Sequence, residues 1–115
     1  MKLYMMRHGE TAWNAENRIL GSTDIPLNEK GREQARIAAE KLKDIHFDMI
    51  YTSQLSRAKE TGLAVAALQE DCKVFHEACL NENDFGEFEG KTAAELENHP
   101  VFPSWLAAEK DVEPP

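Results

Sequence analysis

A short apolar run followed directly by Arg7-His8-Gly9-Glu10-Thr11 is the feature that most limits how this chain can fold. The run over residues 3–6 predicts a buried strand, so His8 is expected at the carboxyl end of that strand, where open α/β sheets place their ligands. Arg7 supplies a guanidinium group that matches phosphate oxygens, and Gly9 lets the backbone come close to a ligand. A lone histidine after a strand is more often a solvated or hydrogen-bonded ring, so this motif needs support from the rest of the chain.

Strands and helices are predicted to alternate downstream. Asn28 is a suitable N-cap, and small or apolar residues then recur every three or four positions, as on one face of a helix. The expected helices cover residues 29–43, 55–68, 92–98 and 104–110, and the expected strands cover residues 3–6, 47–51 and 74–75. This order predicts an α/β fold with a mainly parallel sheet and helices on its faces.

Three further blocks follow the first motif in a fixed order. They are residues 21–35, which contain Asp24-Ile25-Pro26-Leu27, residues 51–61, which contain Arg57, and residues 80–90, which contain Glu82 and Phe85-Gly86. Together the four blocks resemble the histidine phosphatase superfamily, the group that contains cofactor-dependent phosphoglycerate mutase, fructose bisphosphatase domains and many small-molecule phosphatases. The resemblance covers nearly the whole chain and implies a three-layer α/β/α sandwich like that of phosphoglycerate mutase.

The resemblance also implies a role for each matched residue. His8 is expected to be the nucleophile that takes up the phosphoryl group, with Arg7 and Arg57 holding the oxygens of that group. Glu82 matches the proton donor to the leaving-group oxygen. Two further phosphate contacts are expected, from Asn14 and from the backbone of Gly21.

These roles are chemically reasonable apart from the family. A neutral imidazole attacks phosphorus well, and a covalent intermediate divides one difficult hydrolysis into two easier steps. Two arginines can offset the charge of the transferring group without a metal, because phosphoryl transfer depends largely on positioning and electrostatics. An alkoxide leaving group needs a proton, and the negative charge of the substrate itself could keep Glu82 protonated near neutral pH.

Each residue also has a simpler interpretation when it is taken alone. Arg57 in a helix would be a surface residue, and Asn14 would be a turn or capping residue. In isolation, any acid of the region after residue 76 would be a solvated loop carboxylate, and only the surrounding Leu-x-Glu-x-x-Phe-Gly context selects Glu82. The acids of that region are Glu77, Glu82, Asp84, Glu87 and Glu89.

The composition of the chain limits the kinds of molecule that it can bind. The chain has 13 basic and 21 acidic residues, a formal charge of -8, which disfavours nucleic acid and means that a small phosphorylated substrate would depend on local arginines. No apolar stretch is long enough to cross a membrane and no signal peptide is evident, so a cytoplasmic location is expected. Cys72 and Cys79 bracket His76, but this spacing fits no common zinc pattern. We therefore expect neither a metal nor a cofactor.

The chain departs from the family in one respect. Family members carry a second catalytic histidine in a His-Gly block on a later strand, and none of His46, His76 or His99 is followed by glycine. Residues 1–115 are therefore expected to be the N-terminal portion of a single histidine phosphatase domain.

In the family, the strand that carries the second catalytic histidine lies between the first two strands of this chain. An unfilled slot exposes strand edges and favours aggregation, so a homo-oligomer or swapped dimer is one expected outcome.

Three functions stay open at this point. A phosphomonoesterase acting on small phosphorylated metabolites through a phosphohistidine is the first hypothesis, because the direct passage from residues 85–90 to Lys91-Thr92 resembles the small phosphatases. A phosphoglycerate mutase is the second, since a phosphohistidine can pass its group to a hydroxyl as well as to water. A phosphate-binding fragment without turnover is the third, because the second histidine is missing.

Overall fold

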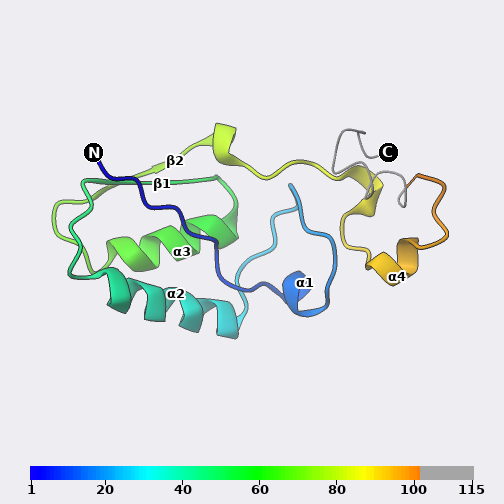
Figure 1. The fold of residues 1–115 in the computed structure, drawn as a ribbon, viewed down its shortest axis with the longest axis horizontal. Helices are drawn as coiled ribbons and strands as arrows, with labels where there is room; N and C mark the ends of the chain where they lie inside the picture. Colours follow the sequence, from blue (N-terminus) through cyan, green and yellow to red (C-terminus); the bar gives the residue numbers. More distant parts are fainter. Residues whose placement is uncertain (102–115) are drawn as a thin grey trace. The chain divides into compact units, whose positions relative to one another are not determined.

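The computed structural model describes residues 1–101, and the chain divides into two compact units (Figure 1). The α/β unit comprises residues 1–11 and 24–81. The loop-rich unit comprises residues 12–23 and the chain from residue 82 onward. Each unit is therefore built from two stretches that are far apart in the sequence.

The α/β unit contains both strands and the two longest helices of residues 1–101. Its elements are helix α2 (Glu29–Leu42), strand β1 (Met49–Thr52), helix α3 (Ser56–Ala66), strand β2 (Lys73–His76) and the single 3-10 turn η1 (Ala78–Leu80). The two strands pair in parallel, with Met49 opposite Lys73 and Thr52 opposite His76. The predicted α/β fold class with a parallel sheet is confirmed, and the predicted bounds of these four main elements differ from the observed ones by one or two residues.

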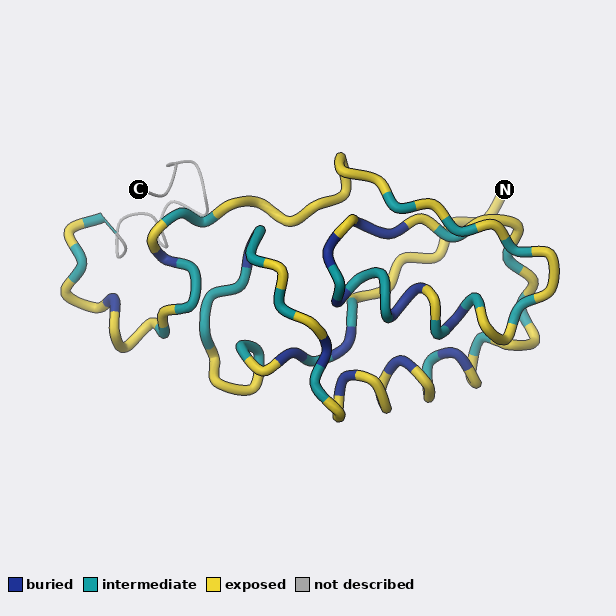
Figure 2. The backbone as a smooth tube through the Cα atoms, turned by 180° about the vertical axis from the view of Figure 1, so that it is seen from behind, coloured by how far each residue is buried: buried dark blue, intermediate teal, exposed yellow. Residues whose placement is uncertain are grey.

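Small side chains allow α2 and α3 to pack closely. Ala35 and Ala39 lie one turn apart on α2 and are 3% and 2% exposed, and Val65 of α3 is 4% exposed. Figure 2 shows the buried positions of α2 recurring on the side of the helix that is turned toward α3. Asn28 caps α2, because its side-chain oxygen accepts a hydrogen bond from the Gly31 amide.

The predicted strand over residues 3–6 is wrong. Residues 1–10 form neither helix nor strand, and the side chains of Leu3 and Met5 are 81% and 89% exposed. A strand exists only where a neighbouring strand accepts and donates its backbone hydrogen bonds. Within the described residues no strand pairs with this segment, although the Tyr4 ring meets the Phe47 ring edge to face at 5.2 Å.

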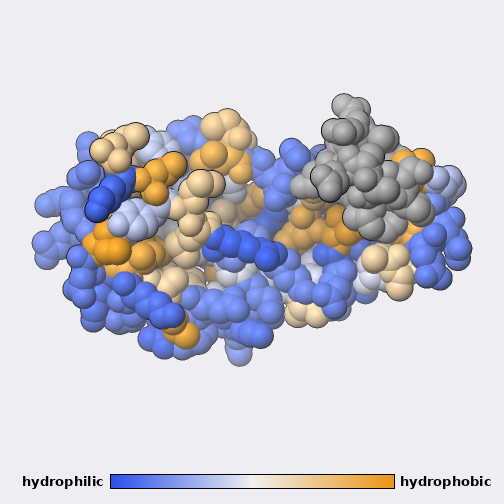
Figure 3. Space-filling view, viewed as in Figure 1, coloured by the Kyte–Doolittle hydropathy of each residue, from blue (hydrophilic) through white to orange (hydrophobic). Residues whose placement is uncertain are grey.

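An apolar surface accompanies this unpaired segment. Figure 3 shows apolar side chains gathered over the N-terminal segment and the two strands, among more polar neighbours. The large hydrophobic residues exposed there are Leu3, Tyr4, Met5, Met6, Met49, Tyr51 and Phe75. Apolar residues that gather in this way differ from the singly scattered ones of an ordinary monomer surface.

The loop-rich unit has a small core. Its elements are helix α1 (Ala12–Ala15), the 3-10 turn η2 (Gly86–Phe88) and helix α4 (Ala93–Leu96). Phe88 and Leu96 are buried, and Ile19, Phe85 and Val101 pack against them. The helix predicted over residues 92–98 is confirmed in part, and α1 was not predicted. The helix predicted over residues 104–110 lies outside the described residues.

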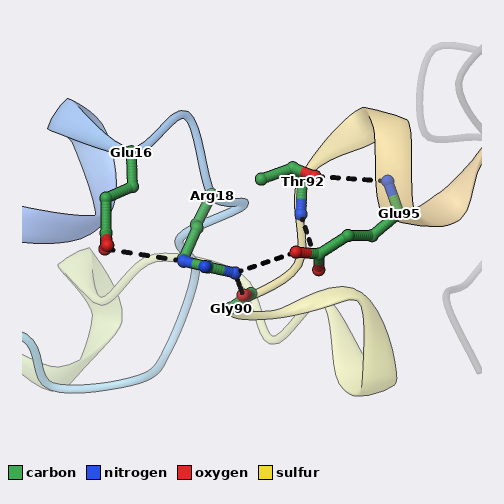
Figure 4. Close-up of polar contacts among 5 residues, drawn as sticks. All are labelled: Glu16, Arg18, Gly90, Thr92 and Glu95. Carbon is green, nitrogen blue, oxygen red and sulfur yellow. Dashed lines mark hydrogen bonds and ion pairs between the residues drawn. The ribbon is translucent and has the colours of Figure 1, made fainter.

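Polar contacts supplement this small core (Figure 4). The Arg18 guanidinium donates to the Gly90 carbonyl oxygen at 2.6 Å and to the Glu95 carboxylate at 3.4 Å, and it lies 3.5 Å from the carboxylate of Glu16. Glu95 also forms a capping box with Thr92, in which each side chain accepts from the backbone amide of the other residue. Arg18 therefore joins the two sequence stretches of this unit.

Among residues 1–101, no helix combines the length and the apolarity that a membrane crossing requires.

Candidate active site

His8 is held in one tautomer by its neighbour. The ring is half-buried, and its Nδ1 atom lies 2.6 Å from the Gly9 carbonyl oxygen. A carbonyl oxygen can only accept, so Nδ1 carries the proton in this contact. In the neutral ring, the lone pair is therefore on Nε2.

The loop that carries His8 is anchored to the start of α2. The backbone amide of Asn28 donates to the Glu10 carbonyl oxygen at 3.0 Å, and the Asn28 side-chain amide donates to the Glu10 carboxylate at 3.0 Å. The Glu10 amide donates in turn to the side-chain oxygen of Gln34 at 2.9 Å. Asn28 thus both caps α2 and orients the residue that lies two positions after His8.

Two glycines allow the His8 loop to lie close to the first turn of α2. A side chain at Gly9 would place its Cβ atom 2.4 Å from the Gly31 carbonyl oxygen, and one at Gly31 would place its Cβ atom 2.0 Å from the Glu10 carbonyl oxygen. Both distances are shorter than the 3.0 Å below which a Cβ atom essentially never approaches a non-bonded atom. The sequence pattern suggested that Gly9 makes room for a ligand, but here its missing side chain makes room for the backbone of α2.

Thr61 joins the His8 loop to α3. Its hydroxyl accepts from the Gly9 amide at 3.1 Å and donates to the Arg57 carbonyl oxygen at 2.8 Å, and the residue is 3% exposed. A hydroxyl that bonds to the carbonyl four residues earlier is a common arrangement for threonine inside a helix. This one side chain therefore fixes the spacing between the His8 loop and the helical turn that contains Arg57.

Arg57 is the second residue of α3, and it is 2% exposed. Burial corrects the simpler interpretation of this residue as a surface arginine. A buried guanidinium is costly, and it is tolerated only at a position that the surrounding structure specifies. Arg7, by contrast, is exposed in the loop before His8.

Asp24 caps the helix that carries Arg57. Leu55 stands at the N-cap position and offers no capping side chain, but the Asp24 carboxylate accepts from the Ser56 amide and the Ser56 hydroxyl, both at 2.7 Å. These two hydrogen bonds, with a smaller contribution from the charges of Arg57 and Lys59, lower the pKa of Asp24 below its ordinary value. An acid distant in sequence thus takes the place of a local cap.

The other predicted site residues belong to the loop-rich unit. Asn14 lies in α1 and is half-buried, and the backbone of Gly21 is buried. Glu82 is exposed, and its carboxylate accepts from the amide of Asn83 at 3.0 Å. The structure therefore places His8, Arg7 and Arg57 in one unit and these three residues in the other.

Sequence reasoning missed Asp24, Gly31 and Thr61 as residues that build the site. All three lie inside the blocks that carry the family resemblance, so their positions were visible although their roles were not. Thr61 had one local signal, since it stands one helical turn after Arg57, where a hydroxyl can bond to the carbonyl of that residue.

The family model of the histidine phosphatase superfamily (branch 1) matches residues 3–115. A 2,3-bisphosphoglycerate-dependent phosphoglycerate mutase 2 of Gloeobacter violaceus is 44% identical over 95 residues, which are 81% of this chain and 43% of the relative. The chain belongs to the histidine phosphatase superfamily.

Solved structures agree with this membership. The α-ribazole phosphatase of Shigella flexneri superimposes with a TM-score of 0.85 at 30% identity, over 95% of this chain and 55% of that protein. A mycobacterial glucosyl-3-phosphoglycerate phosphatase solved with VO3 gives a TM-score of 0.82 at 32% identity, over 93% of this chain and 51% of that protein. The chain spans about half the length of these relatives.

Replacing Gly31 with alanine tests the close seating of the His8 loop. Alanine is better than glycine inside a helix by about 1 kcal/mol. We nevertheless expect Gly31→Ala to lower the free energy of unfolding by about 1–3 kcal/mol, because the loop backbone must move away from the new methyl group. Urea denaturation followed by circular dichroism measures the change, with the exposed Lys41→Ala in the same helix as control. A stabilised Gly31→Ala variant would contradict the contact.

Asp24 should make the stability of the chain depend on pH. Because its folded-state pKa is lowered, its contribution is present above about pH 4 and is lost as the pH falls through the folded-state value. We expect Asp24→Ala to lower the free energy of unfolding at pH 7 by about 0.5–1 kcal/mol, the lower half of the range for helix caps, because the carboxylate is exposed. The difference from wild type should shrink toward pH 2, and a constant difference from pH 7 to pH 2 would disprove the assignment.

Proposed function

We propose that the chain belongs to a phosphomonoesterase that acts on small phosphorylated metabolites through a phosphohistidine on His8. The contact of His8 Nδ1 with the Gly9 carbonyl oxygen at 2.6 Å is the observation that supports the proposal. It orients the ring within its loop and assigns Nε2 as the atom that attacks phosphorus in the proposed reaction. The loop that presents this ring is fixed by Asn28, Gln34 and Thr61, as a nucleophile requires.

The reaction proceeds in two displacements. Nε2 of His8 forms a bond to phosphorus while the bond from phosphorus to the ester oxygen breaks, and the leaving alkoxide takes a proton from Glu82. Water then attacks the phosphohistidine and gives a proton to the Glu82 carboxylate, the phosphorus–nitrogen bond breaks, and inorganic phosphate leaves. Arg7 and Arg57 offset the charge of the equatorial oxygens in both steps. Asn14 supplies a further phosphate contact, whereas the single N–H group of Gly21 already donates to the Glu89 carboxylate at 3.3 Å.

Structural neighbours support hydrolysis. The Shigella flexneri and mycobacterial proteins are both named as phosphatases, and VO3 in the second is an oxyanion of the kind that mimics a transferring phosphoryl group. The chain also passes from Gly90 through Lys91 into the α4 cap at Thr92, without the longer insertion expected of mutases. We therefore propose the class of substrate, a small phosphate monoester, and no particular compound.

A phosphoglycerate mutase is the second candidate. It is favoured by the names of the sequence relatives, among them the Gloeobacter violaceus mutase and the phosphoglycerate mutase-like protein 4 of Arabidopsis thaliana, which is 40% identical over 90 residues. The chemistry up to the phosphohistidine is the same. Only the acceptor differs, being a hydroxyl of a second sugar acid instead of water.

We further propose that residues 1–115 form the N-terminal portion of a single histidine phosphatase domain. The half-length match to relatives and the exposed apolar surface around Leu3 and Met5 support this proposal. Without a complementary segment, the same surface would favour a homo-oligomer or swapped dimer, or leave a fragment that binds phosphate without turnover.

Free thiols at Cys72 and Cys79 suit a cytoplasmic location.

Trapping the covalent intermediate tests the proposed nucleophile. The full-length polypeptide that contains residues 1–115 is mixed with an activated aryl phosphate and quenched in alkali, because phosphohistidine is labile in acid. Peptide mass spectrometry should locate the phosphoryl group on His8. His8→Ala should abolish the label, and His46→Ala, which changes an exposed histidine elsewhere, should retain it. Phosphate binding without any label would favour the binding fragment.

Leaving-group dependence tests the proposed acid. Glu82→Gln should slow hydrolysis of an alkyl phosphate by about 100-fold or more, since a poor leaving group needs the proton. The same variant should slow an activated aryl phosphate much less. Steady-state rates on the two substrates give the ratio, and Glu77→Gln, an exposed acid outside the site, is the control. Equal slowing of both substrates would remove Glu82 from this role.

A further inference from the structure

Glu89 does not behave as the solvated loop acid that its sequence context suggests. Its carboxylate accepts from the Gly21 amide at 3.3 Å, the Thr23 amide at 2.8 Å and the Thr23 hydroxyl at 2.6 Å. It also accepts from the Ser22 hydroxyl at 3.1 Å and, from its own stretch of sequence, from the Phe85 amide at 3.2 Å. One side chain therefore ties residues 21–23 to the loop that begins at Glu82.

Glu89 keeps its charge in this position. Partial burial would raise the pKa of its carboxyl, but the hydrogen bonds with Thr23, Asp84 and Ser22 outweigh burial and lower the pKa to about 2. The group is therefore an anion at neutral pH, and it acts as the acceptor in the hydrogen bonds given above. Hydrogen bonds to a charged acceptor are stronger than those between neutral groups.

Gly21 shows how closely the two segments meet. A Cβ atom at this position would lie 2.3 Å from the Asn83 carbonyl oxygen and 2.6 Å from the Phe85 ring. Only glycine fits there, and its amide is one of the three backbone amides that donate to Glu89. The hydrogen bond thus holds the backbone of residue 21 against the residue that directly follows Glu82.

We propose that Glu89 is a positioning residue for the reaction. It sets the conformation of the loop from which Glu82 delivers its proton, and it places the Gly21 backbone beside that loop. This inference rests on the proposed function, in which Glu82 is the acid. Glu89 itself touches no reacting atom in this scheme.

Other contacts hold the rest of the unit together. The side chains of Phe88 and Leu96 form its core, and Arg18 joins its two stretches through Gly90. The backbone of Ile19 also exchanges two hydrogen bonds with this second stretch, donating to Lys91 and accepting from Gly90, both at 2.9 Å. Loss of the Glu89 charge should therefore loosen the Gly21 and Glu82 loops while the core persists.

Glu89→Gln is the informative variant. Glutamine keeps the size of the side chain but replaces one acceptor oxygen with an NH2 group, which faces the same N–H and O–H donors. We expect amide hydrogen exchange to rise in both residues 20–23 and residues 82–86. In the full-length polypeptide, the ratio of alkyl to aryl phosphate hydrolysis should fall about tenfold, part of the loss expected for removing the acid itself.

Controls separate positioning from general stability. Glu87→Gln changes an exposed acid of η2, the 3-10 turn that ends directly before Glu89. Glu87 pairs with His99, so this variant should leave the ratio of alkyl to aryl phosphate hydrolysis unchanged. Thr23→Val removes the hydroxyl that donates to Glu89. It should lower the ratio of alkyl to aryl phosphate hydrolysis, but by less than Glu89→Gln does. In a Glu82→Gln background, Glu89→Gln should produce no further change in the ratio, because the acid is already absent.

The outcomes are distinct. An unchanged ratio in Glu89→Gln, when Glu82→Gln lowers it, overturns the positioning role and leaves the proposed function intact. An unchanged ratio in both variants overturns the assignment of Glu82 as the acid and the role of Glu89 with it. Increased exchange in only one of the two segments would show that Glu89 does not hold them together.

Discussion

The near-contact between the backbones of Gly9 and Gly31 is the constraint on which the His8 half of the site depends. Because neither residue has a side chain, the loop after His8 lies directly on the first turn of α2. That approach lets Asn28 bond to Glu10 while it caps the same helix. It also brings the Gly9 amide within reach of Thr61 on α3, one helical turn from the buried Arg57. Helix geometry then sets the position of the arginine relative to the loop.

The loop-rich unit reaches a defined conformation by a different route. Among its described residues, the core consists of Phe88 and Leu96 with three half-buried neighbours. Charged side chains bonded to backbone groups supply the remaining order, Arg18 through the Gly90 carbonyl and Glu89 through the amides of residues 21, 23 and 85. Charge-assisted bonds of this kind are directional, so they can fix loop geometry where a small core cannot.

The elements of the α/β unit could be predicted from the sequence because their signals are local. The Asn28 cap and the alternation of small and polar residues define α2 within its own length, and β1 and β2 are short apolar runs at the expected intervals. The segment over residues 3–6 has an equally apolar pattern and is not a strand. An apolar segment becomes a strand only when it pairs with a neighbouring strand, and the local sequence does not show whether such a strand is present. Likewise, an acid such as Glu89 cannot be distinguished from its neighbours until its donors in residues 21–23, more than 60 residues away, are known.

Sequence alone determined the identity and order of the motif residues, and with them the family, because these depend only on residue type and spacing along the chain. It also determined where α2 and α3 lie, since capping and periodicity act over a few residues. Tertiary structure decided which groups hold the site: Asp24 as the cap of α3, Thr61 as the link to the His8 loop, and Glu89 as the anchor of residues 21–23. Each of these bonds joins residues that are distant in sequence, and a hydrogen bond forms only when folding brings its donor and acceptor within about 3 Å.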